Sequence, residues 1–111
     1  MATRHIDPGA FTARLVLERR DEAGDGQGGA DIAFTAVASL WARIDPLGAA
    51  QAEAAGAERQ AVTHRVWLRH RAGVEPGMRL RKGGRILTIQ TVHDPDETGR
   101  YLVCDCTEDG Q

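Results

Sequence analysis

Short stretches of alternating apolar and polar residues recur along the chain, and glycine, proline or aspartate separates them. The clearest stretch covers residues 60–71, where Val66 and Leu68 fall on one side and Arg65 and Trp67 on the other. Comparable stretches predict further strands at 14–20, 35–44, 78–81, 85–92 and 100–108. Because these strands are short and regularly spaced, with little helix between them, we expect an all-β fold: a small six-stranded antiparallel β-barrel or sandwich.

The connections between these strands are of two kinds. Short turns are indicated at 76–77, 83–84 and 93–99, where glycine, proline and aspartate favour chain reversal. Two connections are longer: 21–33 is rich in glycine and acidic residues, and 46–59 is rich in alanine. Alanine favours helix, so the second loop can hold a short helix, although its glycines and its shortage of large apolar side chains make a stable helix unfavourable.

Length and charge narrow the possible roles. The 111 residues fit one domain, 1–111, with a core at about 11–108 from which the two loops extend. The net charge of −2 lacks the positive excess that a general binder of nucleic acid or membrane surfaces needs. No apolar run is long enough for a transmembrane helix and no signal-peptide pattern begins the chain, so we expect a cytoplasmic protein without a membrane partner.

Few residues suggest metal or acid–base chemistry. The possible metal ligands are His64, His70, His93, Cys104 and Cys106. Two cysteines separated by one residue lack the paired spacing of a zinc site and suit a disulfide poorly, so we expect reduced structural thiols. Asp94, Asp96 and Glu97 lie in a predicted turn, and no nucleophile or base accompanies them at a recognisable spacing. The sequence therefore predicts a protein that is not an enzyme and has no cofactor, and a metal-dependent enzyme is the weaker alternative.

Arginine and tryptophan share one face of the predicted third strand. Arg65, Arg69 and Arg71 surround Trp67 on the side opposite its apolar positions. Such a face can stack bases in a barrel that binds single-stranded nucleic acid. It can equally form a protein interface, where tryptophan and arginine are enriched, or be an ordinary solvated face. The absence of net positive charge favours a protein interface, and a single-stranded nucleic-acid binder stays as the alternative function.

Taken in order, the segments resemble a known family. The resemblance rests on RLVLERR, an acidic glycine loop, LWARIDPLG, an alanine-rich stretch, and THRVWLRHRAGVEPGMRLRKGGRILTIQTVHDPDETGRYLVCDCTE, together spanning about 11–108. This order is similar to that of the head–tail joining proteins of long-tailed phages, also called head-closure, stopper or adaptor proteins. The composition also fits a prophage or a gene-transfer-agent-like particle. One departure is visible: members often carry a glutamate soon after the glycine at Gly48, where this chain has Ala49, Ala50 and Gln51.

The resemblance implies a small β-barrel whose copies form a ring, usually twelvefold, beneath the portal of a DNA-filled head. Such a ring joins a portal or portal-adaptor protein above to a tail terminator or tail-tube protein below. Double-stranded DNA passes through it without sequence-specific contact. The implied location is the neck of a phage or phage-like particle that is assembled in the bacterial cytoplasm.

Two sets of residues follow from the resemblance as hypotheses. A loop that reaches the channel and gates or retains DNA would include Leu47, Gly48, Gln51, Glu53, Gly56, Glu58 and Arg59. The surface between neighbouring subunits would include Trp41, Arg65, Trp67, Arg69 and Arg71, facing acids such as Glu18, Asp94 and Asp96. The glycine loop at 21–31 would contact an adjoining ring or tail component.

Overall fold

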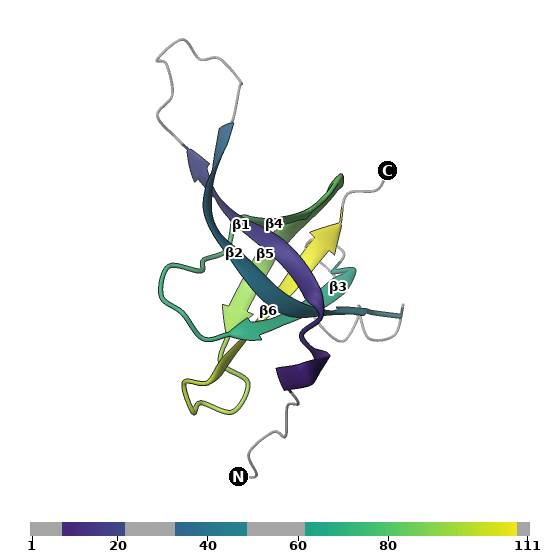
Figure 1. Ribbon diagram of the computed structural model, residues 1–111, viewed down its shortest axis with the longest axis vertical. Coiled ribbons are helices and arrows are strands. Elements are labelled where there is room, and N and C mark those ends of the chain that lie inside the picture. The colour runs from purple at the N-terminus through teal and green to yellow at the C-terminus, as the bar shows by residue number, and fades with distance from the viewer. Residues whose placement is uncertain (1–7, 22–32, 49–61, 109–111) are drawn as a thin grey trace.

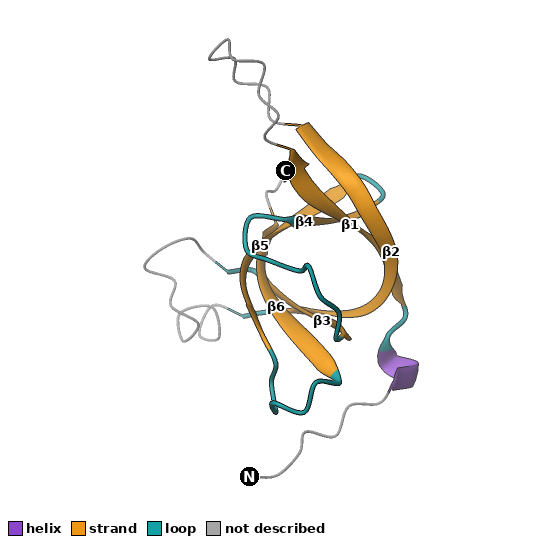
Figure 2. Ribbon diagram, turned by 90° about the vertical axis from the view of Figure 1, so that its left-hand side faces the viewer, coloured by secondary structure: helices purple, strands orange, loops and turns teal. Residues whose placement is uncertain are grey.

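Six antiparallel strands close into one barrel in the computed structural model, which describes residues 8–21, 33–48 and 62–108 (Figure 1). The strands are β1 (Ala13–Asp21), β2 (Ala33–Pro46), β3 (His64–Arg69), β4 (Arg79–Lys82), β5 (Arg85–His93) and β6 (Tyr101–Glu108). Their order around the barrel is β1-β2-β3-β6-β5-β4, and a short 3-10 turn, η1 (Pro8–Ala10), precedes β1. The predicted all-β class and six antiparallel strands are confirmed, and the sheet is a barrel (Figure 2).

Aliphatic side chains fill the barrel, because alternate residues of every strand point inward. The buried cluster comprises Leu15, Leu17, Ala42, Val66, Leu68, Val74, Met78, Leu80, Leu87, Ile89, Leu102, Cys104 and Cys106. The short turns expected at 76–77 and 83–84 are present between β3 and β4 and between β4 and β5. The short helix expected within 46–59 falls on residues outside the described ranges.

A second apolar cluster lies on the outer side of β3 and β6. Trp67 and Val103 are paired across these strands, and Phe11 and Tyr101 complete the cluster. The Phe11 and Tyr101 rings lie 5.6 Å apart between centroids. As a result Trp67 is only 6% exposed, so it does not share the accessible surface of the arginine stripe in which the sequence placed it. The alternation of apolar and polar residues predicts which side chains point into the barrel. It does not predict that the segment before β1 covers part of the outer surface.

The barrel closes where β1 meets β4. Leu17 pairs with Leu80 on the inner side of this seam, and Glu18, which is 5% exposed, lies on the outer side. Arg79 Nε donates to Glu18 Oε1 at 2.6 Å, and Arg81 Nε donates to Glu18 Oε2 at 2.8 Å. One carboxylate therefore holds two arginines of the neighbouring strand, with both of its oxygens hydrogen-bonded.

The seam also anchors β2. The guanidinium carbon of Arg79 lies 3.8 Å from the centroid of the Phe34 ring, a cation–π contact. Phe34 pairs with Arg20 beyond the β1–β4 seam, in the part of β2 that pairs with β1 alone. Figure 1 shows this two-stranded end of β1 and β2 projecting beyond the barrel.

The protonation of Glu18 is linked to stability. Burial alone would raise its pKa, but the hydrogen bonds and charges of Arg79 and Arg81 outweigh burial and lower it. Because the pKa is lower in the folded than in the unfolded state, the stabilisation is present above the ordinary glutamate value of 4.5. It is lost as the pH falls from that value through the folded-state pKa.

We expect Glu18→Gln to lower the free energy of unfolding at neutral pH by about 1–3 kcal/mol, because two charge-assisted hydrogen bonds are weakened. Urea denaturation at neutral and acid pH measures this loss. The variant should also lose less stability than the wild type below pH 4.5. Equal stability of the two proteins at neutral pH would contradict this role for the seam.

Candidate interaction surface

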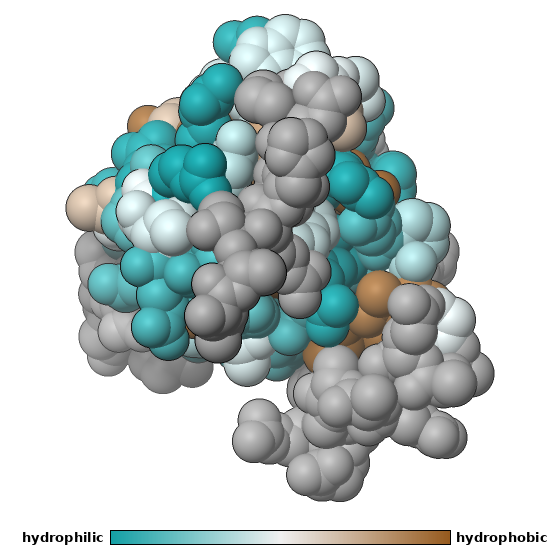
Figure 3. Space-filling view, turned by 90° about the horizontal axis from the view of Figure 1, so that it is seen from below, coloured by the Kyte–Doolittle hydropathy of each residue, from teal (hydrophilic) through white to brown (hydrophobic). Residues whose placement is uncertain are grey.

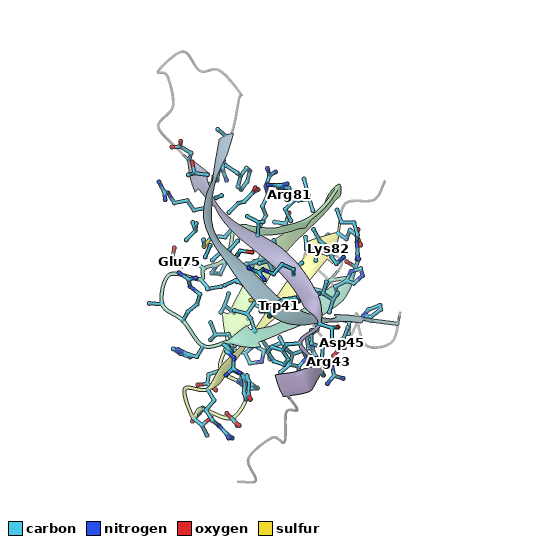
Figure 4. All side chains as sticks on the ribbon, viewed as in Figure 1. Trp41, Arg43, Asp45, Glu75, Arg81 and Lys82 are labelled. Atoms are coloured by element: carbon cyan, nitrogen blue, oxygen red, sulfur yellow. The ribbon has the colours of Figure 1, made fainter. Side chains whose placement is uncertain are left out.

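Trp41 is the most prominent apolar side chain on the described surface. It is 54% exposed, because the next residue of β2, Ala42, points into the core. The guanidinium carbon of Arg14 lies 4.9 Å from the Trp41 ring centroid, and Arg14 Nε donates to Ser39 Oγ at 2.7 Å. Arg14 pairs with Trp41 across β1 and β2, so the two side chains lie side by side on the outside of the barrel. Figure 4 shows Trp41 midway along the barrel, away from the projecting end of β2.

Two hollows adjoin Trp41. One, of about 490 Å³, is lined by Phe11, Thr12, Trp41 and Arg69. The other, of about 310 Å³, is lined by Ser39, Leu40, Trp41, Leu68, Arg69, His70 and Arg71. Among the described residues no aspartate or glutamate lines either hollow. We call Trp41, Arg14, Arg69 and Arg71 the Trp41 face; it combines an accessible aromatic ring with positive charge.

The other arginines on the outside of β2 and β3 are paired within the chain. Arg65 Nε lies 2.9 Å from Asp105 Oδ1, and the second oxygen of Asp105 accepts a hydrogen bond from the Thr91 hydroxyl at 3.1 Å. Arg43 Nε lies 3.0 Å from Asp45 Oδ1. Within the described ranges no acid forms an ion pair with Arg69 or Arg71. The predicted arginine stripe therefore divides into a part that is paired with acids and a part, Arg69 and Arg71, with which no described acid is paired.

The acids assigned to the opposite side of a subunit interface are engaged within the chain. Asp94 accepts hydrogen bonds from the backbone N–H groups of Asp96, Glu97 and Gly99. Asp96 accepts one from the Thr98 hydroxyl at 2.7 Å, and this bond is the main reason why the pKa of Asp96 is lowered. These contacts confirm the turn expected at 93–99.

A subunit-interface role for Trp41, Arg65, Trp67, Arg69, Arg71, Asp94 and Asp96 stays a prediction. Arg14, in contrast, was not foreseen as a member of the Trp41 face. Its contact with Trp41 depends on the register of β1 against β2, which a long connection leaves open in the sequence. Seen from below, the described surface is mainly hydrophilic, with apolar areas on both sides, the clearest of them at the lower right (Figure 3).

A backbone hydrogen bond joins the two ends of the proposed gating loop. Leu47 N–H donates to the Thr63 carbonyl at 2.9 Å, so the chain is held together where it leaves β2 and where it approaches β3. Leu47 and Gly48 are the last described residues on the β2 side. The other members of the predicted loop, Gln51, Glu53, Gly56, Glu58 and Arg59, lie outside the described ranges.

The candidate metal ligands do not converge. In the described part of the chain no group of three or more histidine, cysteine, aspartate or glutamate side chains is arranged to hold a metal ion. Both cysteines are free and buried in the core. Burial, with a smaller effect from Asp105, raises the pKa of Cys104 to about 12, and burial likewise raises the pKa of Cys106. No helix among the described residues is long and apolar enough to cross a membrane.

Two solved structures share this fold. The solution structure of protein SF1141 from Shigella flexneri 2a has a TM-score of 0.74 and 23% sequence identity, covering 96% of this chain and 99% of that one. A chain in the virion of a native gene transfer agent particle has a TM-score of 0.59 and 23% identity, covering 86% of this chain and 94% of that one. No curated protein matches the chain.

The barrel therefore has the fold of a class of small β proteins that includes a chain of a gene transfer agent virion. The sequence pattern of the phage head completion proteins matches residues 6–109, and the chain belongs to that family. It is thus a phage head structural protein, and the resemblance noted from the sequence is confirmed.

We expect both thiols to resist alkylation in the folded protein at mildly alkaline pH, because burial keeps them protonated and inaccessible. Labelling followed by mass spectrometry, with and without denaturant, measures this. Both cysteines should react in denaturant. Rapid modification of the folded protein would contradict their place in a closed barrel.

Proposed function

We propose that the chain is a head–tail connector subunit, either a stopper or an adaptor. Copies of it form a ring, twelvefold in the particle, beneath the portal. The ring joins the DNA-filled head to the tail and helps to retain or gate the DNA. Membership of the head completion family supports a place at the closing end of the head. The role is structural rather than enzymatic.

One feature of the barrel carries this proposal. The two long connections of the chain adjoin opposite ends of β2: residues 22–32 precede Ala33, and residues 49–61 follow Gly48. The 14 residues of β2 span about 43 Å at the usual rise per residue. A rigid strand with a chain segment at each end suits a ring subunit that contacts another molecule at each end of the strand. The portal or portal adaptor would lie on one side, and the tail terminator or tail tube on the other.

The ring would sit in the neck of a phage or phage-like particle, and its parts would assemble in the bacterial cytoplasm. Double-stranded DNA would pass through the ring without sequence-specific contact. The 49–61 segment would reach the channel, and the hydrogen bond between Leu47 and Thr63 would anchor both of its ends.

A strain that lacks the gene tests the proposal as a whole. We expect filled heads without tails that lose their DNA, seen by electron microscopy and by nuclease digestion. Normal tailed particles would overturn the proposal. A gel shift of single-stranded oligonucleotides by the purified protein that weakens with salt would favour the nucleic-acid-binding alternative instead.

We expect Arg69→Glu to reduce the joining of heads to tails, because it reverses a charge on the Trp41 face that no described acid neutralises. An assay that counts tailed particles when purified heads, tails and protein are mixed measures the effect. Lys82→Glu, on an exposed position of β4, is the control with the same charge change and should join normally. Unchanged joining with Arg69→Glu would remove the face from the mechanism.

We expect replacement of residues 49–61 by a short glycine–serine linker to leave the barrel folded, because Leu47 and Thr63 already hold the ends of this segment together. Thermal unfolding monitors the barrel. Filled heads that carry the variant should expose more DNA to nuclease than wild-type heads. A glycine–serine segment of the original length separates the effect of length from that of sequence, and full protection with both variants would show that the loop does not retain DNA.

A further inference from the structure

We infer that the Trp41 face receives the acidic segment 22–32 of a second copy of this chain, so that neighbouring subunits meet head to tail. This inference deepens the proposed ring and rests on it. It also names a different acidic partner from the turn acids that the sequence suggested.

The Trp41 face has the properties of a contact site that is not satisfied within the described chain. Its indole is 54% exposed, whereas a partly buried position is usual for tryptophan in a folded domain. Hollows of about 490 Å³ and 310 Å³ lie against the ring. Arg69 and Arg71 contribute positive charge beside it, and Arg14 stacks on it. An apolar ring surrounded by arginines fits a segment that carries small or apolar side chains and several carboxylates.

The acids that the sequence suggested for this partner are poor candidates. Glu18 is buried between Arg79 and Arg81. Asp94 and Asp96 already accept the hydrogen bonds that hold their turn together. Binding of any of these acids to a partner would break ion pairs or hydrogen bonds within the subunit.

Segment 22–32, EAGDGQGGADI, has the complementary chemistry. It contains three acids, Glu22, Asp25 and Asp31, and no lysine or arginine. Alanine, glycine and Ile32 make up most of the rest, so carboxylates alternate with small or apolar residues that can approach an aromatic ring closely. Stretches 89–99 and 101–111 also combine three acids with the absence of lysine and arginine. However, Asp94 and Asp96 hold their turn, and Asp105 and Glu108 are paired with Arg65 and Arg85.

The acids of this segment cannot reach the Trp41 face of their own subunit. Trp41 follows Ala33 by eight residues, which is about 26 Å along β2. Both ends of the segment are fixed, since Asp21 pairs with Ala33. The acids lie near these ends: Asp25, the farthest of them, is four residues from Asp21 and can be at most about 14 Å from it. The acids and the face are therefore complementary but separated along one rigid ribbon, and a contact between them must join two copies.

Such a contact is heterologous, because different surfaces of the two copies meet. Repeated contacts of this kind close into a ring when the rotation between subunits is a fraction of a full turn. A protein that pairs in this way needs no second interface to make a ring. The separation of the two patches along β2 also prevents each subunit from neutralising its own site.

Site-specific crosslinking tests the contact directly. A photoreactive phenylalanine derivative replaces Trp41 in one preparation and Ser39, which lines the second hollow, in another. Light and isotopically heavy chains are mixed and irradiated, both as concentrated protein and in assembled particles. We expect crosslinks between light and heavy chains, localised by fragmentation to residues 22–32. Crosslinks only to DNA, to another particle protein or to no other chain, from both positions, would overturn the inference.

Mixed variants test the head-to-tail arrangement. Trp41→Ala removes the face and keeps the acidic segment, whereas Glu22→Gln/Asp25→Asn/Asp31→Asn does the reverse. Each variant alone should lose crosslinking between copies from position 39 by about tenfold. In the mixture, crosslinks should form in one direction only. They should run from position 39 of the variant with the neutralised segment, which keeps Trp41, to residues 22–32 of the Trp41→Ala variant, which keep their acids. Val37→Ala and Glu75→Gln, at exposed positions outside the contact, are controls and should crosslink like the wild type.

The outcomes separate this inference from the proposed function. If both variants crosslink as the wild type does, the contact is wrong, and the ring can still form through another surface. If the deletion strain makes normal tailed particles, the connector role fails even where purified copies crosslink.

Discussion

Closure of the barrel is the constraint on which the rest of the structure depends. A six-stranded sheet that closes has no exposed edge, but it needs the first and last strands of the sheet to meet in register. Here β1 and β4 meet over only three residue pairs, Val16 to Glu18 against Arg81 to Arg79. The leucines inside this seam are supported on the outside by one carboxylate that binds two arginines. A short ladder is thus reinforced by charge where few backbone pairs are available.

Because the barrel is small, its own side chains fill the interior. Leucine, valine, isoleucine and cysteine occupy the interior, and the described interior offers no polar cluster for catalysis. The charged side chains of the described strands therefore lie outside this apolar cluster. The outer surface is not uniform, since Arg65 and Arg43 are neutralised by neighbouring acids while no described acid is paired with Arg69 or Arg71. This contrast is the reason why we propose the Trp41 face as a contact site.

The sequence predicted the strands well because each inward position of a narrow barrel must be apolar. It predicted the surface less well, and the two tryptophans explain why. Trp41 and Trp67 both occupy outward positions, yet one is exposed and the other is covered through contact with the segment that contains Phe11. The alternation of residues along a strand does not show whether another segment packs on the outer side of the barrel. The sequence also could not predict that Arg14 pairs with Trp41, since β1 and β2 are separated by a long connection and β1 has an irregularity after Leu17.

The length of β2 has a mechanical consequence for a subunit of the proposed connector. Its outer end pairs with β1 alone, whereas Ala42 to Pro46 pair with β3. A pull along this projection would act parallel to the strands and across their hydrogen bonds, which run perpendicular to the strand direction. The bonds of the β1–β4 and β2–β3 ladders would then share the load together, instead of breaking one after another as in peeling. The geometry that carries the projecting ribbon is therefore also the one in which a sheet best resists tension.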